Sequence, residues 1–89
     1  MNKARRKAID DIISRLNNIN AELDDIKGEI QTLYDEEQEY FDNIPEGLRS
    51  SDNGQAAESA ASALNDADLQ EALTTIDEAI SKLEEARDG

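Results

Sequence analysis

Eight Ile and Leu residues recur at alternating steps of three and four positions over residues 9–33. They are Ile9, Leu16, Leu23 and Ile30 at position a of a heptad, and Ile12, Ile19, Ile26 and Leu33 at position d. Such a repeat is typical of a helix that packs along its length against another helix. The pattern predicts a helix over residues 4–42, roughly 58 Å long at 1.5 Å per residue.

A turn is predicted to follow at residues 43–52. Pro45 disfavours helical geometry at Ile44 and cannot donate a backbone hydrogen bond, so the first helix must stop before it. Asp52 is a suitable N-cap for a second helix, and Gln55, three residues later, would complete a capping box. The second helix is expected over residues 53–87.

The second helix changes its apolar phase halfway. Its first half is rich in alanine, and its second half carries a regular series of Leu69, Leu73, Ile76, Ile80 and Leu83. Because Leu64 and Leu69 are five residues apart, the two halves are out of register. We expect the helix to continue with a local change in winding near residues 65–68, since it then matches the first helix in length. The alternative is a break at Asn65 and Asp66, after which Asp68 caps a new helix toward Glu71.

These elements predict an all-α fold in which residues 1–89 form a single domain, an antiparallel two-helix hairpin. Ile13, Tyr34 and Phe41 fall at heptad position e and widen the apolar stripe of the first helix beyond what one neighbour covers. A lone helix pair is rarely stable without disulfide bonds or further burial, and the chain has no cysteine to form a disulfide. We therefore expect a homo-oligomer, first of all a dimer, that forms a four-helix bundle. The expected seam consists of Ile9, Ile12, Ile13, Leu16, Ile19, Leu23, Ile26, Ile30 and Leu33.

Composition argues against catalysis and against cofactors. The chain has no histidine, the commonest general base and transition-metal ligand. Glu36 and Glu39, like Asp68 and Glu71, are spaced by one helical turn, as are the magnesium-binding carboxylates of all-helical nucleotide pyrophosphohydrolases. No basic phosphate-binding residues accompany either pair, and no EF-hand, phosphate-loop or zinc spacing is present. We expect no enzymatic activity, no bound metal and no cofactor.

The net charge of −13 is spread unevenly along the chain. Residues 1–7 carry +4 and residues 35–46 carry −6. Such a field repels nucleic acid and anionic lipid from most of the surface and attracts a basic protein. No apolar run is long enough to span a membrane, and the N-terminus lacks the apolar core of a signal peptide. We expect a cytoplasmic protein that contacts neither nucleic acid nor membrane directly.

A candidate partner-binding surface, called here the acidic patch, surrounds the predicted end of the first helix. It comprises Tyr34, Asp35, Glu36, Glu39, Tyr40, Asp42 and Glu46. Aromatic side chains rimmed by charge are frequent protein-binding anchors. Negative charge at a helix C-terminus also opposes the macrodipole, so helix stability alone does not select this arrangement. The alternative is structural, with Tyr40 and Phe41 plugging the end of the bundle against Ile44, Leu48 and nearby alanines.

A second candidate surface, the basic cluster, lies at the start of the first helix. It comprises Lys3, Arg5, Arg6 and Lys7, which could bind an anion if an oligomer brought several copies together. The alternative is that these cations pair with Glu84, Glu85 and Asp88, which a hairpin would bring alongside.

Residues 37–48, EQEYFDNIPEGL, precede an Ala/Glu-rich helix that ends in SKLEEA. This combination resembles a group of small acidic proteins encoded by tailed phages and prophages. The resemblance implies a helical hairpin and a phage setting, and hence the cytoplasm of a bacterial host. It implies no activity and supplies no catalytic residues.

Three functions remain open at this stage. The first is a modulator or inhibitor that binds a host protein, such as a nucleic-acid-handling or defence protein, through the acidic patch. The second is a structural, assembly or scaffolding factor of a phage, which would bind through its apolar stripes. The third is an oligomer that binds a small phosphorylated ligand through the basic cluster. Binding by charge should weaken steeply with salt, whereas binding by apolar stripes should not.

Overall fold

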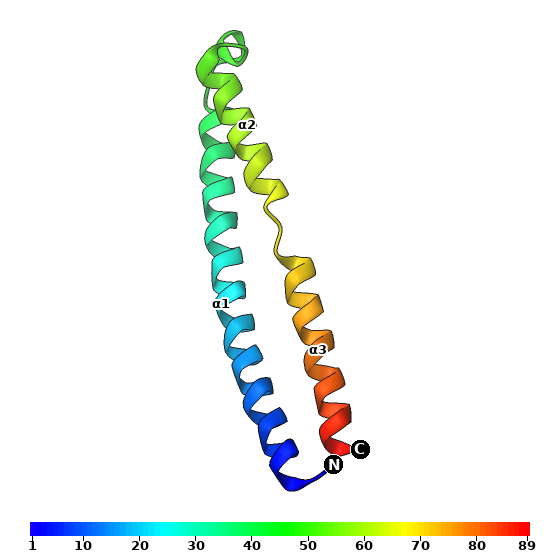
Figure 1. Cartoon of the computed structure of the whole chain (residues 1–89). Helices are drawn as coiled ribbons and strands as arrows, with labels where there is room; N and C mark the ends of the chain where they lie inside the picture. Colours follow the sequence, from blue (N-terminus) through cyan, green and yellow to red (C-terminus); the bar gives the residue numbers. More distant parts are fainter. The chain divides into compact units, whose positions relative to one another are not determined.

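The computed structural model describes all residues, 1–89, and contains helices but no strands. Helix α1 spans Lys3–Asp42, the 3-10 helix η1 spans Glu46–Leu48, α2 spans Asp52–Asp66 and α3 spans Gln70–Asp88 (Figure 1). The predicted all-α fold is confirmed. The first helix and the turn lie where the heptad pattern and Pro45 place them.

Packing contacts divide the chain into two compact units. Unit 1 comprises Met1–Asp25 and Leu69–Gly89, so it pairs the first part of α1 with α3. Unit 2 is Ile26–Asp68, in which the chain turns through η1 and α2 runs back along the last part of α1 (Figure 1). The antiparallel pairing of helices predicted from the sequence is therefore found within each unit.

The second half of the chain is not one helix. Helix α2 ends at Asp66 and α3 begins at Gln70, so the preferred prediction of continuity through residues 65–68 is wrong and the alternative of a break holds. The physical reason is the five-residue step, because a continuous helix would turn Leu69 about 140° away from the side that carries Leu64. The predicted cap of the new helix also differs. Leu69, not Asp68, occupies the N-cap position, and it makes no side-chain cap hydrogen bond.

The N-cap of α2 lies one residue before the predicted one. Ser51 is the N-cap in place of Asp52, with an extended backbone and a hydroxyl that accepts a hydrogen bond from Gly54 N–H at 3.4 Å. The side-chain amide of Gln55 donates to the carbonyl oxygen of Ser50 at 3.0 Å, so the predicted capping box does not form. Gly54 is buried, and a Cβ there would overlap the backbone of Arg49.

Each unit has its own small core. In unit 1 the buried side chains are Ile9 and Ile13 of α1 and Ile80 of α3, and Leu16, Ile76 and Leu83 pack against them. In unit 2 the buried side chains are the alanines Ala57 and Ala61 of α2, as the alanine-rich sequence suggests. Small residues there let the two helices approach closely.

The heptad of α1 is divided between two faces. In unit 1, positions a and e face α3, as Ile9 and Ile13 show. At position d, Ile12, Ile19 and Leu33 remain 42%, 49% and 50% exposed. Part of the predicted seam is therefore left uncovered by the chain itself. No helix of the chain is both long enough and apolar enough to cross a bilayer.

Candidate binding surface at the turn of unit 2

The acids of the acidic patch are presented by the last turns of α1 and by η1. All five are exposed: Asp35, Glu36, Glu39, Asp42 and Glu46. Two accept a hydrogen bond from a glutamine one turn earlier, Asp35 from Gln31 at 3.0 Å and Asp42 from Gln38 at 3.1 Å. None forms an ion pair, since the ion pairs found involve Lys82 and Arg87 in unit 1. The charge of the patch is therefore left uncompensated.

Arg49 is a residue of this turn that the sequence pattern did not single out. Its side chain donates from Nε to the carbonyl oxygen of Ile44 and from Nη2 to that of Asp42, both at 3.2 Å. Its guanidinium lies 5.4 Å from the centroid of the Phe41 ring, a cation–π distance. Arg49 thus caps the C-terminus of α1 and leaves the patch carboxylates unpaired. The available signal was that Arg49 is the single Lys or Arg between residues 28 and 81.

The turn also exposes two large apolar side chains. Tyr40 is 53% and Leu48 is 57% exposed. Both line one open hollow of about 300 Å³, together with Ile44 and Pro45. Phe41 is half-buried, so it packs inward while Tyr40 does not plug the end of the helix pair. A partner could place an apolar side chain between Tyr40 and Leu48.

Tyr34 is separated from the rest of the acidic patch by its packing. It is half-buried and lines a hollow of about 180 Å³ with Ile30, Leu64 and Asn65, near the end of α2. Tyr34 also lines a second hollow, with Phe41 and Ala61. The structure therefore brings six of the seven patch residues to an exposed surface and places Tyr34 among the helix-packing residues.

Unit 2 as a whole is strongly acidic. It contains eleven Asp and Glu against two Lys and Arg, a net charge of −9. Exposed charges of one sign at this density produce a field that raises the encounter rate with an oppositely charged protein. The exposed acids of the acidic patch and the apolar pair of Tyr40 and Leu48 lie at the same turn.

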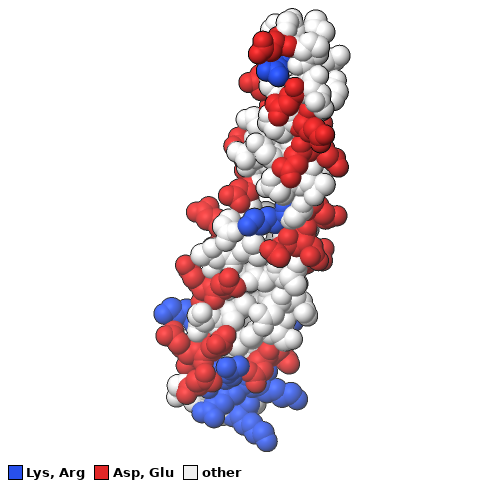
Figure 2. All heavy atoms as spheres, turned by 180° about the vertical axis from the view of Figure 1, so that it is seen from behind, with Lys and Arg blue, Asp and Glu red and all other residues white.

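The basic cluster lies on the first turns of α1 in unit 1. All four cations are exposed and none forms an ion pair. Figure 2 shows Lys and Arg side chains gathered over this end. The helix itself begins with a neutral cap, because Asn2 Oδ1 accepts from the backbone N–H of Arg5 at 2.8 Å. Positive side chains near a helix N-terminus are unfavourable for the helix dipole, so the cluster does not stabilise α1.

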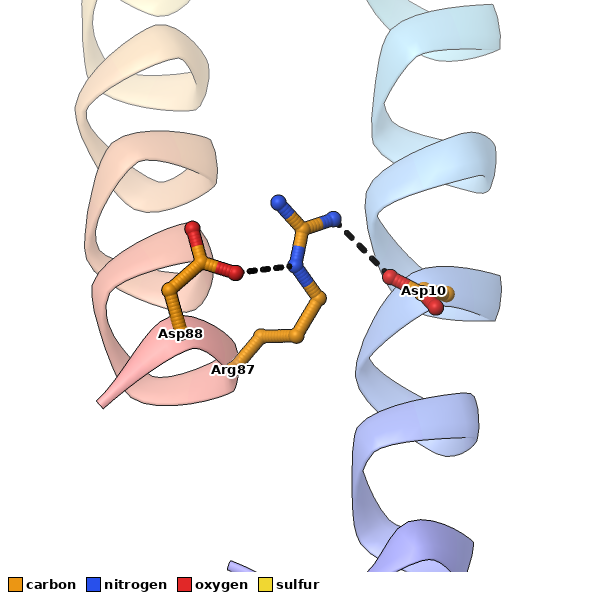
Figure 3. Close-up of polar contacts among 3 residues, drawn as sticks. All are labelled: Asp10, Arg87 and Asp88. Atoms are coloured by element: carbon orange, nitrogen blue, oxygen red, sulfur yellow. Dashed lines mark hydrogen bonds and ion pairs between the residues drawn. The ribbon is translucent and has the colours of Figure 1, made fainter.

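The C-terminal acids do not pair with the basic cluster, contrary to the structural alternative in the sequence analysis. Glu85 pairs with Lys82 at 3.1 Å, and Asp88 pairs with Arg87 at 3.0 Å. Arg87 Nη1 also pairs with Asp10 of α1 at 2.9 Å. Figure 3 shows the guanidinium between the carboxylates of Asp88 and Asp10. Hydrogen bonds to Asp88 and then to Asp10 raise the pKa of the Arg87 guanidinium above its usual range.

No three potential ligand side chains lie close enough together to hold a metal ion. Glu36 and Glu39 are both exposed on α1. Asp68 lies in the break before α3, so Asp68 and Glu71 do not lie one turn apart on a single helix.

Comparison of the chain with models of protein families, with curated proteins and with solved structures finds no match in any of the three. The phage setting therefore stays a prediction from residues 37–48.

Proposed function

We propose that this chain is a non-enzymatic protein-binding module whose partner carries a basic surface. The observation that carries the proposal is the turn of unit 2, where exposed Tyr40 and Leu48 line one hollow beside five unpaired carboxylates. An apolar anchor surrounded by charge is a common design of protein interfaces.

The two kinds of group have different roles in this proposal. Burial of Tyr40 and Leu48 supplies affinity, at roughly 25 cal/mol per Å² of apolar surface removed from water. The carboxylates steer the partner and select basic surfaces over acidic ones. Arg49 supports both, because it holds the end of α1 in place without neutralising the patch.

The proposed setting is the cytoplasm of a phage-infected bacterium, which rests on the resemblance of residues 37–48 to small phage proteins. There the chain would modulate or inhibit a host protein whose basic surface serves nucleic-acid handling or defence. Covering that surface with carboxylates would block its normal ligand.

The test is a pull-down from bacterial lysate with the tagged full chain, washed at low and then at high salt. We expect a basic protein to be retained at low salt and released by high salt. Retention should be lost with Glu36→Lys/Glu39→Lys and reduced with Tyr40→Ala. The matched control is Asp24→Lys/Asp25→Lys, which makes the same change of charge on α1 outside the patch. Equal binding by the patch and control variants would refute the role of the patch.

A structural or assembly role is the second candidate, and the exposed d positions of α1 favour it. Ile12, Ile19 and Leu33 are large, apolar and about half exposed on a surface that is otherwise highly charged. Binding of a phage structural protein through these side chains would resist high salt, and it would be lost with Ile12→Ser/Ile19→Ser. Binding of a small phosphorylated ligand through the unpaired basic cluster is a third candidate. It would be lost on removal of residues 1–7.

A further inference from the structure

We propose that Asn53 is a site of spontaneous deamidation and that the Ser51 cap at the start of α2 sets the rate of the reaction. Deamidation converts the side-chain carboxamide to a carboxylate and so adds a negative charge close to the acidic patch. Three features of this turn carry the proposal: the Asn53–Gly54 sequence, the packing that requires a glycine at position 54, and the hydrogen bond of the cap.

Asn53 is the one asparagine of the chain that precedes a glycine. Its side chain is exposed and forms no hydrogen bond. Deamidation of an asparagine begins when the backbone nitrogen of the next residue attacks the side-chain Cγ. A glycine hinders this attack least, because it has no Cβ and its backbone rotates most freely. Exposure and the following glycine together make Asn53 the most reactive asparagine of the chain.

The fold requires the glycine that makes Asn53 reactive. Gly54 is buried, and a Cβ at this position would overlap the backbone of Arg49 in the turn before α2. A larger residue, which would slow the attack on Asn53, cannot occupy position 54 unless the turn moves. The close approach of Arg49 and Gly54 therefore keeps a reactive dipeptide at the start of α2.

The reaction needs water but no oxidant and no cofactor. The Gly54 nitrogen forms a bond to Cγ of Asn53 and loses its proton, and the side-chain nitrogen of Asn53 leaves as ammonia. Water then opens the resulting cyclic succinimide at either of its carbonyl carbons. One opening gives an aspartate in the normal backbone. The other gives an isoaspartate, in which the backbone runs through the former side chain.

The folded start of α2 holds this attack back. Ser51 Oγ accepts a hydrogen bond from the Gly54 N–H, whose nitrogen is the attacking atom. Asn53 also lies in the first turn of α2, and its backbone must rotate out of the helical conformation before the nitrogen can reach Cγ. The cap hydrogen bond is long, at 3.4 Å, and helix ends open more readily than helix centres. The reaction therefore proceeds from molecules in which the first turn of α2 is open.

The product would alter the candidate binding surface, a consequence that rests on the proposed function. Asn53 and Tyr40 line two hollows together, one with Leu48 and the other with Glu37. An aspartate at position 53 would add a carboxylate to the walls of both hollows and strengthen the attraction of a basic partner. An isoaspartate would lengthen the backbone of the first turn and disrupt the start of α2.

Mass spectrometry of the full chain, incubated at mildly alkaline pH, tests the site and the role of the cap. Peptide fragmentation follows the exchange of an amide for a carboxylate at each asparagine, and we expect Asn53 to react first. Ser51→Ala should react about fivefold faster, the factor that corresponds to a cap of about 1 kcal/mol. Ser51→Thr keeps an acceptor hydroxyl and should react at close to the wild-type rate. In guanidinium chloride all three chains should react alike, because no cap remains.

Faster reaction at another asparagine, or no reaction of Asn53 in the folded wild-type chain, would overturn the modification site. Equal rates in folded Ser51→Ala and in the folded wild type would overturn the role of the cap. Circular dichroism before incubation confirms that each chain is helical.

The effect on binding is tested separately with Asn53→Asp, which reproduces the product with the normal backbone. In the salt-washed pull-down, a retained basic protein should require more salt for release from Asn53→Asp than from the wild type. The matched control is Asn18→Asp, at an exposed position of α1 in unit 1. Release of the basic protein at the same salt from both variants would refute the effect on binding. If the wild type retains no basic protein, the proposed function fails, whereas the mass measurement still decides whether Asn53 deamidates.

Discussion

The side-chain amide of Asn20 donates a hydrogen bond to the carboxylate of Asp77 at 2.6 Å, which joins α1 to α3 within unit 1. Asn20 occupies position e, where Ile13 one heptad earlier is buried in the core. The Oδ1 atom of Asn20 is buried and has no hydrogen-bond partner. This polar pair fixes which turns of α1 and α3 face each other, and it does so at a cost in stability.

Replacement of Asn20 by an apolar residue should therefore stabilise unit 1. We expect Asn20→Leu to raise the free energy of unfolding by about 1 kcal/mol, because it removes the orphaned oxygen while exposed Asp77 stays solvated. Urea denaturation followed by circular dichroism measures the change, with exposed Asn18→Leu as the control. A loss of stability in Asn20→Leu would mean that the hydrogen bond outweighs the buried oxygen.

The two glycines that lie within α-helices should respond oppositely to alanine. Gly54→Ala should destabilise the protein by about 1–3 kcal/mol, because the new Cβ overlaps the Arg49 backbone at the start of α2. Gly28→Ala should stabilise it by about 0.5–1 kcal/mol, since nothing lies near that site in the middle of α1. Both are measured as shifts of the urea midpoint. A stable Gly54→Ala variant would show that the turn can shift away from α2.

Removal of the Arg49 side chain should loosen the turn. We expect Arg49→Ala to cost about 1–2 kcal/mol of stability, through the loss of two hydrogen bonds to carbonyls and of the contact with Phe41. Arg49→Lys keeps the charge but loses the planar fork, so it should recover only part of the loss. Amide hydrogen exchange at the end of α1 gives the local readout. Full recovery in Arg49→Lys would mean that charge alone stabilises the turn.

The ion pairs of Arg87 should be insensitive to pH over the neutral and mildly alkaline range. Hydrogen bonds to Asp88 and Asp10 raise the pKa of the guanidinium, so the stability that they contribute is present below the ordinary arginine pKa. That contribution is lost as the pH rises through the raised pKa of the Arg87 guanidinium. Arg87→Gln should lower the urea midpoint slightly and equally at neutral and mildly alkaline pH. The difference should shrink in high salt, because the pairs are solvent-exposed.

The long first helix and the turn could be predicted because the heptad of residues 9–33 and Pro45 each allow few alternatives. The face of α1 that packs against α2 and α3 could not be predicted, because apolar side chains occur at positions a, d and e alike. The N-cap of α2 was ambiguous for a similar reason. Ser50, Ser51, Asp52 and Asn53 are consecutive and all favour that position, so the close approach at Gly54 decides between them.

The candidate binding surface was predictable in composition but not in detail. The exposure of the acids on the turn could be expected from their density, whereas the inward packing of Tyr34 depends on the hollow formed with Leu64 and Asn65 of α2. The role of Arg49 depends on the path of the turn, which returns its side chain to the carbonyls of α1. Neither contact has a signature in residue spacing.

The break between α2 and α3 has a consequence for how the sequence can change length. In an unbroken helix, one inserted residue rotates every later side chain by about 100°, which would turn the apolar stripe of α3 out of its core. At Ala67, Asp68 and Leu69 no helix has to be kept in phase. Insertions or deletions there would leave the alanine stripe of α2 and the Leu/Ile stripe of α3 intact, so this segment is where the chain can best accept an added peptide.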